Sequence, residues 1–150
     1  MKIELPYIST LYKKLYLSRI ADNLNTMLTS GIPMLKALEL TANVIDNTIY
    51  EAIMSEVIED VKGGFALSDA FGKHAEIPGI LVAMTRVGEE TGEVGSILKT
   101  LARFYQKEVV SAVDTLVDLI EPLMIVMLGL GVGFLLASVL IPIYNISSNI

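Results

Sequence analysis

Apolar residues recur along this chain at three- and four-residue spacing through most of its first 120 positions, which is typical of amphipathic helices. No run of strict apolar–polar alternation bounded by turn residues occurs, so no strand is expected. Glycine and proline divide the pattern into about six segments separated by short loops, and short loops favour antiparallel neighbours. The sequence therefore predicts an all-α fold, an antiparallel bundle of about six helices whose last helix continues into a C-terminal transmembrane helix.

Turn and cap residues delimit the first three predicted helices. A linker is expected over residues 1–10, with the first helix beginning at residue 9 or 10. Gly31 ends this helix and Pro33 begins the second, while the Asp-Asn-Thr sequence at 46–48 offers a cap to the third. The apolar stripes comprise Leu17, Ile20, Leu24, Met27 and Leu28, then Leu35, Leu38, Ala42 and Ile45, and then Ile49, Ile53 and Val57, the last three expected to face inward.

The next three helices follow the Gly-Gly pair at 63–64. A short helix is predicted over residues 67–71, a fifth helix opens at Pro78, and the turn at 88–92 closes it. The sixth helix begins near residue 93 and meets no break up to Ile120. Its stripe and that of the fifth helix comprise Leu81, Met84 and Val87, then Val94, Ile97, Leu98, Leu101, Phe104 and Tyr105.

The most apolar segment of the chain is PLMIVMLGLGVGFLLASVLIPIYNI, residues 122–146, which carries no charged side chain. About 25 helical residues at ~1.5 Å each are long enough to cross a hydrocarbon core of ~30 Å. A buried core helix is the alternative, but core helices are rarely apolar on all sides over such a length. A transmembrane helix is therefore predicted over residues 116–144, with a short tail at 145–150 and a kink where Pro122 enters the bilayer.

Charge distribution predicts the topology of this span. Every Lys and Arg precedes it, the last being Lys107, and positively charged segments stay on the cytoplasmic side. Residues 11–115 are therefore expected to form a cytoplasmic domain and the tail to be non-cytoplasmic. Hydrophobic residues make up 53% of the chain and the mean hydropathy is +0.59, and the apolar span accounts for much of that excess over a soluble domain.

Composition excludes several classes of function. A net charge of −6 leaves no basic patch to neutralise phosphates, so no nucleic-acid partner is expected. Cysteine is absent, which excludes disulfides and thiolate metal sites, and the single histidine, His74, has no second imidazole to share a metal with. No nucleophile–base pair or phosphate-binding loop is recognisable, so the chain is expected to be no enzyme and to need neither a cofactor nor a metal.

Two acidic clusters invite a functional interpretation. Asp114, Asp118 and Glu121 lie on one helix face at the membrane boundary, where they could form a proton or cation site, although a solvated or salt-bridged face is favoured. Glu89 and Glu90, in the turn before the sixth helix, could help to hold a hard cation such as Ca²⁺. The favoured interpretation is that acids in this turn complement the dipole of that helix.

Small residues recur at every fourth position within the span, at Gly129, Gly133 and Ala137. This spacing lets a second helix approach closely in lipid, so a helix-packing face is predicted there. The alternative is that the glycines are only tolerated, because glycine is common in transmembrane helices.

Six short motifs occur in an order and spacing that resemble a known family. They are TSGIP at 29–33, GFALS at 64–68, VGEETG at 87–92, LARFY at 101–105, IEP at 120–122 and PIY at 142–144. Together they resemble the type II secretion F domain, the repeat unit of the GspF/PilC platform proteins. The residues that match the family motif are Gly31, Pro33, Gly88, Glu89, Glu90, Gly92, Glu121 and Pro122.

The resemblance implies a platform in the inner membrane of a type II secretion or type IV pilus machine, which couples a cytoplasmic assembly ATPase to pilin or pseudopilin subunits. It also implies contacts with other inner-membrane assembly proteins and a homo-oligomer. The alternative function is a single-pass membrane adaptor or an ion- or proton-coupled membrane protein outside the secretion machinery.

The chain departs from the family pattern in two respects. Family members usually carry two repeats and about three spans, whereas this chain holds one repeat, similar to the C-terminal one, and one span. It is therefore either a piece of a longer protein or a half-length protein that pairs. Ala66 stands where the family commonly has a serine that caps the short fourth helix, so this helix is expected to fray or to be capped by another group.

Overall fold

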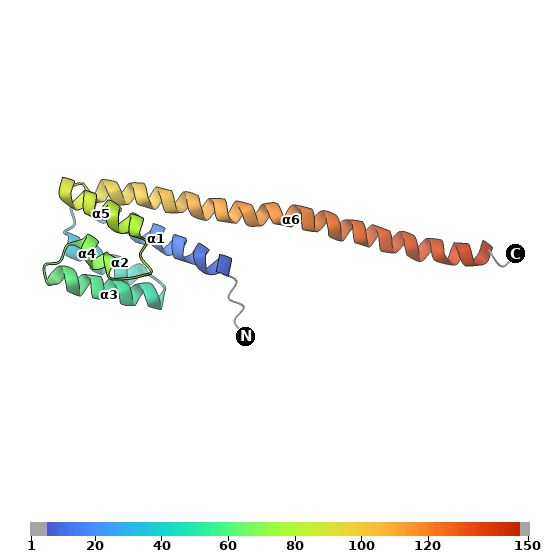
Figure 1. The fold of residues 1–150 in the computed structure, drawn as a ribbon, viewed down its shortest axis with the longest axis horizontal. Coiled ribbons are helices and arrows are strands. Elements are labelled where there is room, and N and C mark those ends of the chain that lie inside the picture. Colours follow the sequence, from blue (N-terminus) through green and yellow to red (C-terminus); the bar gives the residue numbers. More distant parts are fainter. Residues whose placement is uncertain (1–5, 148–150) are drawn as a thin grey trace. The chain divides into compact units, whose positions relative to one another are not determined.

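The computed structural model describes residues 6–147, and within that range it consists of six helices and no strand (Figure 1). The all-α prediction is confirmed. The chain divides into two compact units, Met1–Val110 and Ser111–Ile150, which are described in turn. The helices are α1 (Pro6–Thr29), α2 (Met34–Val44), α3 (Thr48–Lys62), α4 (Leu67–Gly72), α5 (Gly79–Thr91) and α6 (Val94–Ser147).

Helix α1 begins at Pro6, earlier than the start at residue 9 or 10 that the sequence predicts. Proline lacks a backbone N–H and has a fixed φ, and both properties suit the first position of a helix. Residues 6–10 of the expected linker are therefore helical, while its residues 1–5 lie outside the described residues, as do residues 148–150 of the tail.

Glycines end three of the helices in the left-handed conformation, with φ of +84° at Gly31, +94° at Gly64 and +75° at Gly92. After α1, the N–H of Ile32 donates to the carbonyl of Met27 at 3.0 Å, which closes the chain back over the last helical turn. A side chain at such a φ is strained, so glycine is the residue that these three turns require. The helix ends predicted from Gly31, from the Gly-Gly pair at 63–64 and from the turn at 88–92 are confirmed.

Asn47 caps α3, as the sequence predicts, because its side-chain oxygen accepts from the N–H groups of Ile49 at 3.0 Å and Tyr50 at 3.2 Å. The inward orientation predicted for Ile49 is wrong, since its side chain is 58% exposed. The buried face of α3 starts one residue later, at Tyr50, whose ring stacks on Tyr16 of α1 at 5.4 Å.

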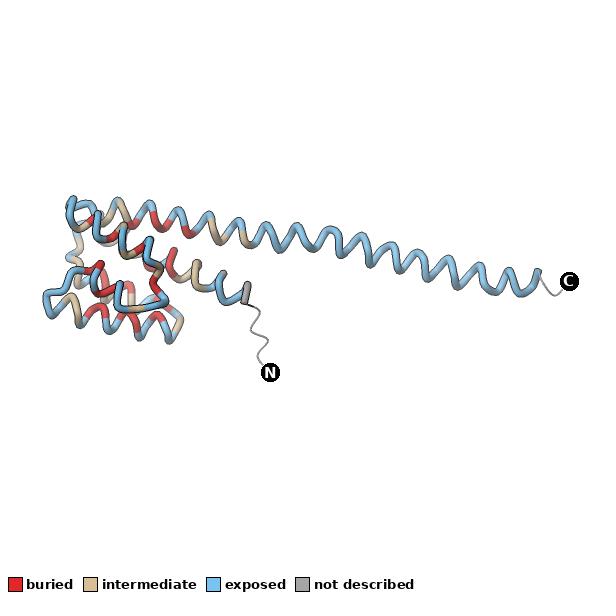
Figure 2. Tube along the Cα trace, in the orientation of Figure 1, coloured by how far each residue is buried: buried red, intermediate tan, exposed pale blue. Residues whose placement is uncertain are grey.

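The core of the first unit lies between the inner faces of α1 to α5 and the first turns of α6 (Figure 2). Small buried residues, Ala21, Ala37, Ala70 and Ala102, occur on four different helices and let the backbones approach. The largest fully buried apolar side chains are Phe71, Leu17, Ile20, Leu24, Leu38, Met54, Leu81 and Leu98.

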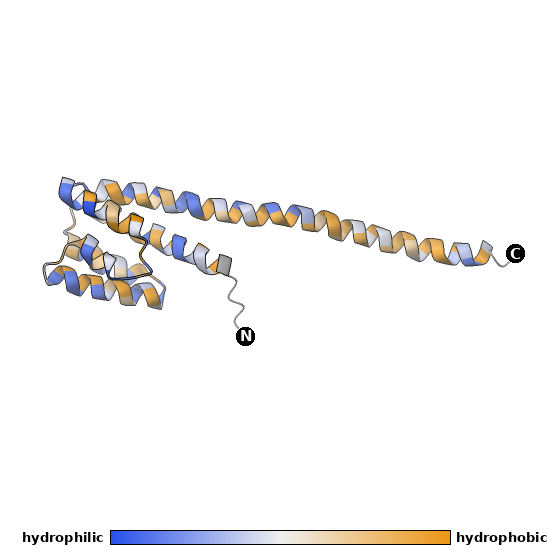
Figure 3. Ribbon diagram, in the orientation of Figure 1, coloured by the Kyte–Doolittle hydropathy of each residue, from blue (hydrophilic) through white to orange (hydrophobic). Residues whose placement is uncertain are grey.

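The second unit, from Ser111 onward, consists of the rest of α6 as far as the structure describes it. This helix is the one among the described residues that is long and apolar enough to cross a membrane. Every residue from 113 to 147 is exposed, including a long series of Leu, Ile, Val and Met (Figures 2 and 3). Exposed apolar area on this scale is unfavourable in water and favourable in a bilayer. Pro122 and Pro142 both lie inside α6, and the helix continues past each of them.

The burial of Tyr50 predicts that the stability of the bundle responds to alkaline pH. Burial, and to a smaller extent the negative charges of Glu76 and Tyr105, raise the pKa of Tyr50 to about 12. Unfolded tyrosine ionises near pH 10, so between pH ~10 and ~12 the unfolded chain loses a proton that the folded chain keeps. The unit should therefore lose stability as the pH rises through this range. Urea unfolding followed by circular dichroism at pH 8 and pH 11 measures the loss, and Tyr50→Phe should reduce it.

The matched control is Tyr12→Phe, which removes the hydroxyl of a tyrosine that is 54% exposed. Equal alkaline destabilisation in Tyr50→Phe and in Tyr12→Phe would contradict the assignment to Tyr50.

Candidate functional site

Glu89, in the motif at 87–92, caps helix α4 from α5. Its carboxylate accepts hydrogen bonds from the backbone N–H of Leu67 at 2.5 Å, from the N–H of Ser68 at 3.3 Å and from the Ser68 hydroxyl at 2.5 Å. Ala66, at the N-cap position of α4, supplies no side-chain hydrogen bond. Of the two outcomes expected for the missing serine cap, capping by another group is therefore the one observed. A carboxylate at this helix start also complements the helix dipole.

Gly88, the neighbour of Glu89, sets the close approach of α5 and α6. A Cβ atom at Gly88 would lie 2.9 Å from the Cα of Val94 and 3.3 Å from the side chain of Ile97. Gly92 closes α5, and the N–H of Glu93 then donates to the carbonyl of Gly88 at 2.9 Å. The motif therefore combines a long-range cap with the tight turn that joins two helices.

The other motif residues of the first unit have simpler roles. Pro33 occupies the N-cap position of α2, one residue before the helix begins, and its carbonyl accepts from the N–H of Ala37 at 2.9 Å. Gly31 provides the turn before it. Glu90 is exposed. These positions build turns, and the long reach of Glu89 is the contact that sequence reasoning missed, although the absence of a cap at Ala66 was a signal for it.

Within the acidic turn at 89–93, Glu89 is arranged differently from the favoured interpretation of the sequence, whereas Glu93 directly precedes the first residue of α6. Glu89 points to the start of α4, so the helix dipole that its carboxylate complements is that of α4 and not that of α6. Among residues 6–147, no group of three or more His, Asp or Glu side chains is placed so as to hold a metal ion.

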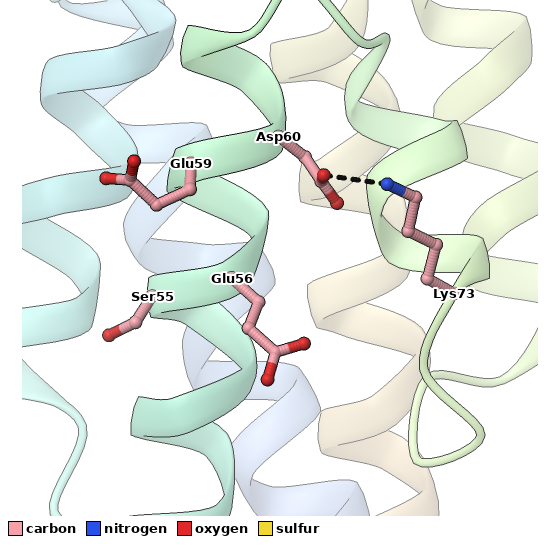
Figure 4. Close-up of a pocket in the computed structure, with 5 residues that line it drawn as sticks. All are labelled: Ser55, Glu56, Glu59, Asp60 and Lys73. Atoms are coloured by element: carbon pink, nitrogen blue, oxygen red, sulfur yellow. Dashed lines mark hydrogen bonds and ion pairs between the residues drawn. The ribbon is translucent and has the colours of Figure 1, made fainter.

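A surface pocket of about 410 Å³ lies on α3 beside α4, lined by Ser55, Glu56, Glu59, Asp60 and Lys73 (Figure 4). Lys73 pairs with Asp60 at 2.7 Å, the side chain of Glu56 points to the same side of α3 as that pair, and Glu59 points to the opposite side. The Nε2 atom of His74 lies 3.8 Å from Glu56, too far for a hydrogen bond. These side chains form a charged, solvated surface with no reactive pair.

The predicted site residues of the second unit all lie on α6 and are exposed. They are Asp114, Asp118, Glu121, Pro122, Gly129, Gly133 and Ala137. A Cβ atom at Gly129 or Gly133 would meet nothing within 4 Å, so this side of the helix is open to a neighbour. A helix-packing role for the two glycines and Ala137 stays a prediction.

Comparison with known proteins identifies the family. The sequence model of type II secretion system protein F matches residues 20–142. The chain is 30% identical to the type IV pilus assembly protein PilC of Pseudomonas aeruginosa and 33% identical to that of Thermus thermophilus, each over 97% of this chain. It is also 31% identical to the type II secretion system protein F of Xanthomonas campestris over 95% of this chain.

The chain spans only 39%, 36% and 35%, respectively, of the lengths of these three relatives. The match covers both the helical bundle and most of the apolar helix, and it confirms the resemblance in the motifs. This chain belongs to the type II secretion system protein F family, which includes the type IV pilus assembly protein PilC.

Proposed function

We propose that this chain acts as an inner-membrane platform of a type II secretion or type IV pilus machine, where it couples a cytoplasmic assembly ATPase to pilin or pseudopilin subunits. The observation that carries the proposal is the family match over residues 20–142, which takes in the bundle and the apolar helix together. Such a platform acts by holding other proteins in position, so it needs a rigid domain, a membrane anchor and contact surfaces, and no reactive group.

The proposed topology has the bundle in the cytoplasm, the span at 116–144 in the inner membrane and the tail at 145–150 outside. The distribution of charge supports it, because all eleven Lys and Arg residues precede the span. The three cations nearest to the span are Lys99, Arg103 and Lys107.

Within the membrane, the face formed by Gly129, Gly133 and Ala137 is proposed to pack against a second helix, from another copy of the chain or from another inner-membrane assembly protein. Its small side chains would let two backbones approach, and van der Waals contact is then the main attraction in lipid. The open space around both glycines supports this proposal.

Replacing Gly133 by leucine tests the platform and its packing face together. The bulky side chain should hold the helices apart, while the helix stays apolar enough to insert and the bundle stays folded. We expect self-association in a membrane reporter assay to fall several-fold. Assembly of pili, or secretion, should be lost in cells whose own copy of the gene is replaced by this variant.

The matched control is Val132→Leu, which adds bulk at the neighbouring position, away from the three small residues. If the two leucine variants behaved alike in both assays, the packing face would be assigned incorrectly. If cells lacking the whole chain still assembled pili and secreted normally, the platform function itself would be refuted.

A further inference from the structure

An exposed apolar strip runs along the outside of the α5–α6 pair. Ile80 and Val87 of α5 are 56% and 47% exposed, and Phe104 of α6 is 48% exposed. Below them, Met84 and Ile97 are half-buried against the core. We call these five residues the α5–α6 seam.

Helix geometry places these residues together. On α5, Val82 lies against Gly72 of α4 and Glu89 reaches the start of α4, so that flank of α5 faces α4. Ile80 and Val87 are seven residues apart and so share one side of α5, the flank opposite to Val82 and Glu89. Phe104 follows Ile97 by two helical turns and so lies on the same side of α6, the side that a Cβ atom at Gly88 would touch.

A row of cations borders the seam on α6. Lys99, Arg103 and Lys107 are spaced four residues apart, so they follow one exposed face, and Phe104 is adjacent to Arg103 and one turn from Lys107. None of the three cations forms an ion pair among the described residues.

The carboxylate of α6 nearest to this border is Glu108, directly after Lys107, and it is already paired with Lys14 of α1 at 2.7 Å. Between Val94 and Lys107 α6 carries no carboxylate, so the three cations keep their positive charge at the surface. On the α5 side, Arg86 is paired with Asp69 at 2.7 Å, and Glu90 is an exposed carboxylate at the turn. The combination is an apolar strip with a positive border on one side.

We propose that the α5–α6 seam is the surface on which the bundle binds the cytoplasmic assembly ATPase, through an amphipathic helix of the ATPase whose apolar stripe is flanked by Asp or Glu. This inference rests on the proposed function. The apolar side chains of such a helix would cover Ile80, Val87 and Phe104, and its carboxylates would pair with Arg103 and Lys107. Among the proposed partners, the ATPase is the one that is cytoplasmic throughout.

A second copy of this chain fits the seam less well. Two copies that are inserted in one membrane with the same orientation and form a symmetric dimer are related by a two-fold axis along the membrane normal, so this face would pair with itself at the same height. A contact through this face would bring together two rows of Lys99, Arg103 and Lys107, and like charges repel.

An anionic lipid surface also fits less well. The segment between Lys107 and the apolar span carries Asp114, Asp118 and Glu121, and these carboxylates would repel anionic headgroups where the chain enters the membrane.

The test uses the full chain in nanodiscs of zwitterionic lipid and the purified assembly ATPase of the same machine. The double variant Arg103→Glu, Lys107→Glu and the single variant Phe104→Ser should each weaken binding of the ATPase at least tenfold. Binding of the ATPase to the unmodified chain should also weaken when the salt concentration rises from about 50 to about 300 mM, because salt screens the charged pairs. Circular dichroism checks that each variant is folded.

The matched controls change the same chemistry elsewhere on the bundle. Lys36→Glu, Lys62→Glu reverses two charges on α2 and α3, and Phe65→Ser removes a phenylalanine that is 53% exposed. Both should bind the ATPase within about twofold of the unmodified chain, since surface changes away from a contact have small effects.

Three outcomes would overturn the proposal. If the ATPase bound the seam variants and the unmodified chain equally, the seam would be the wrong surface while the coupling function stood. If the unmodified chain did not bind the ATPase at all, the proposed coupling itself would fail. If residues 99–107 gained protection from hydrogen exchange in anionic nanodiscs without ATPase, the seam would be a lipid contact.

Discussion

Replacing Glu89 by alanine is expected to lower the free energy of unfolding of the bundle by about 2–4 kcal/mol. The loss would leave the hydroxyl of Ser68, a residue that is 1% exposed, and the N–H groups of Leu67 and Ser68 without their acceptor. Each buried donor that loses its partner carries a desolvation cost, and the acceptor removed here is charged.

Urea unfolding of the full chain in detergent micelles, followed by circular dichroism, measures this effect. Glu90→Ala is the matched control, because Glu90 is exposed, and it should change the free energy of unfolding by no more than about 0.5 kcal/mol. Ala66→Ser, added to Glu89→Ala, should restore about 1 kcal/mol by supplying the missing N-cap. Equal stability of the two alanine variants would show that the cap contributes little.

Replacing Gly88 by alanine is expected to destabilise the bundle by about 1–3 kcal/mol, the usual cost of overpacking a tight core. The new Cβ atom would lie 2.9 Å from the Cα of Val94, which is a backbone atom and cannot rotate away. The two helices would have to separate, and the turn at Gly92 would open with them.

Gly79→Ala is the control for Gly88→Ala, because it adds the same atom to the same helix where nothing lies within 4 Å. It should stabilise the bundle by about 0.4–1 kcal/mol, since alanine restricts the unfolded chain and fits the helix. The two substitutions should therefore shift the urea midpoint in opposite directions. A shift in the same direction would mean that α5 and α6 are not packed as closely as described.

The parts of the fold that are encoded locally could be predicted from the sequence. The helix ends at Gly31, Gly64 and Gly92 and the cap at Asn47 depend on residues within a few positions of each other, so the order of residue types is enough to locate them. The apolar helix could be predicted for the same reason, because its signal is continuous in sequence.

The parts that depend on packing could not be predicted. Phe104 and Val87 fit the helical spacing of apolar residues and yet are exposed, because spacing alone does not say which residues another helix covers. Ile49 fails for a related reason, since Tyr50 takes the inward position. The contact from Glu89 to Leu67 joins residues 22 positions apart, and no periodicity reports such a contact.

The contact from Glu89 to α4 also sets an order of events during synthesis. The start of α4 leaves the ribosome before Glu89 does, and the 22 positions between them take about 1–4 s to translate. For that interval α4, a helix of six residues, has neither a side-chain cap from Ala66 nor its distant acceptor. So short a helix is marginal by itself. The nascent chain should therefore hold α1 to α3 together first, with α4 becoming helical only as α5 arrives to fold against it.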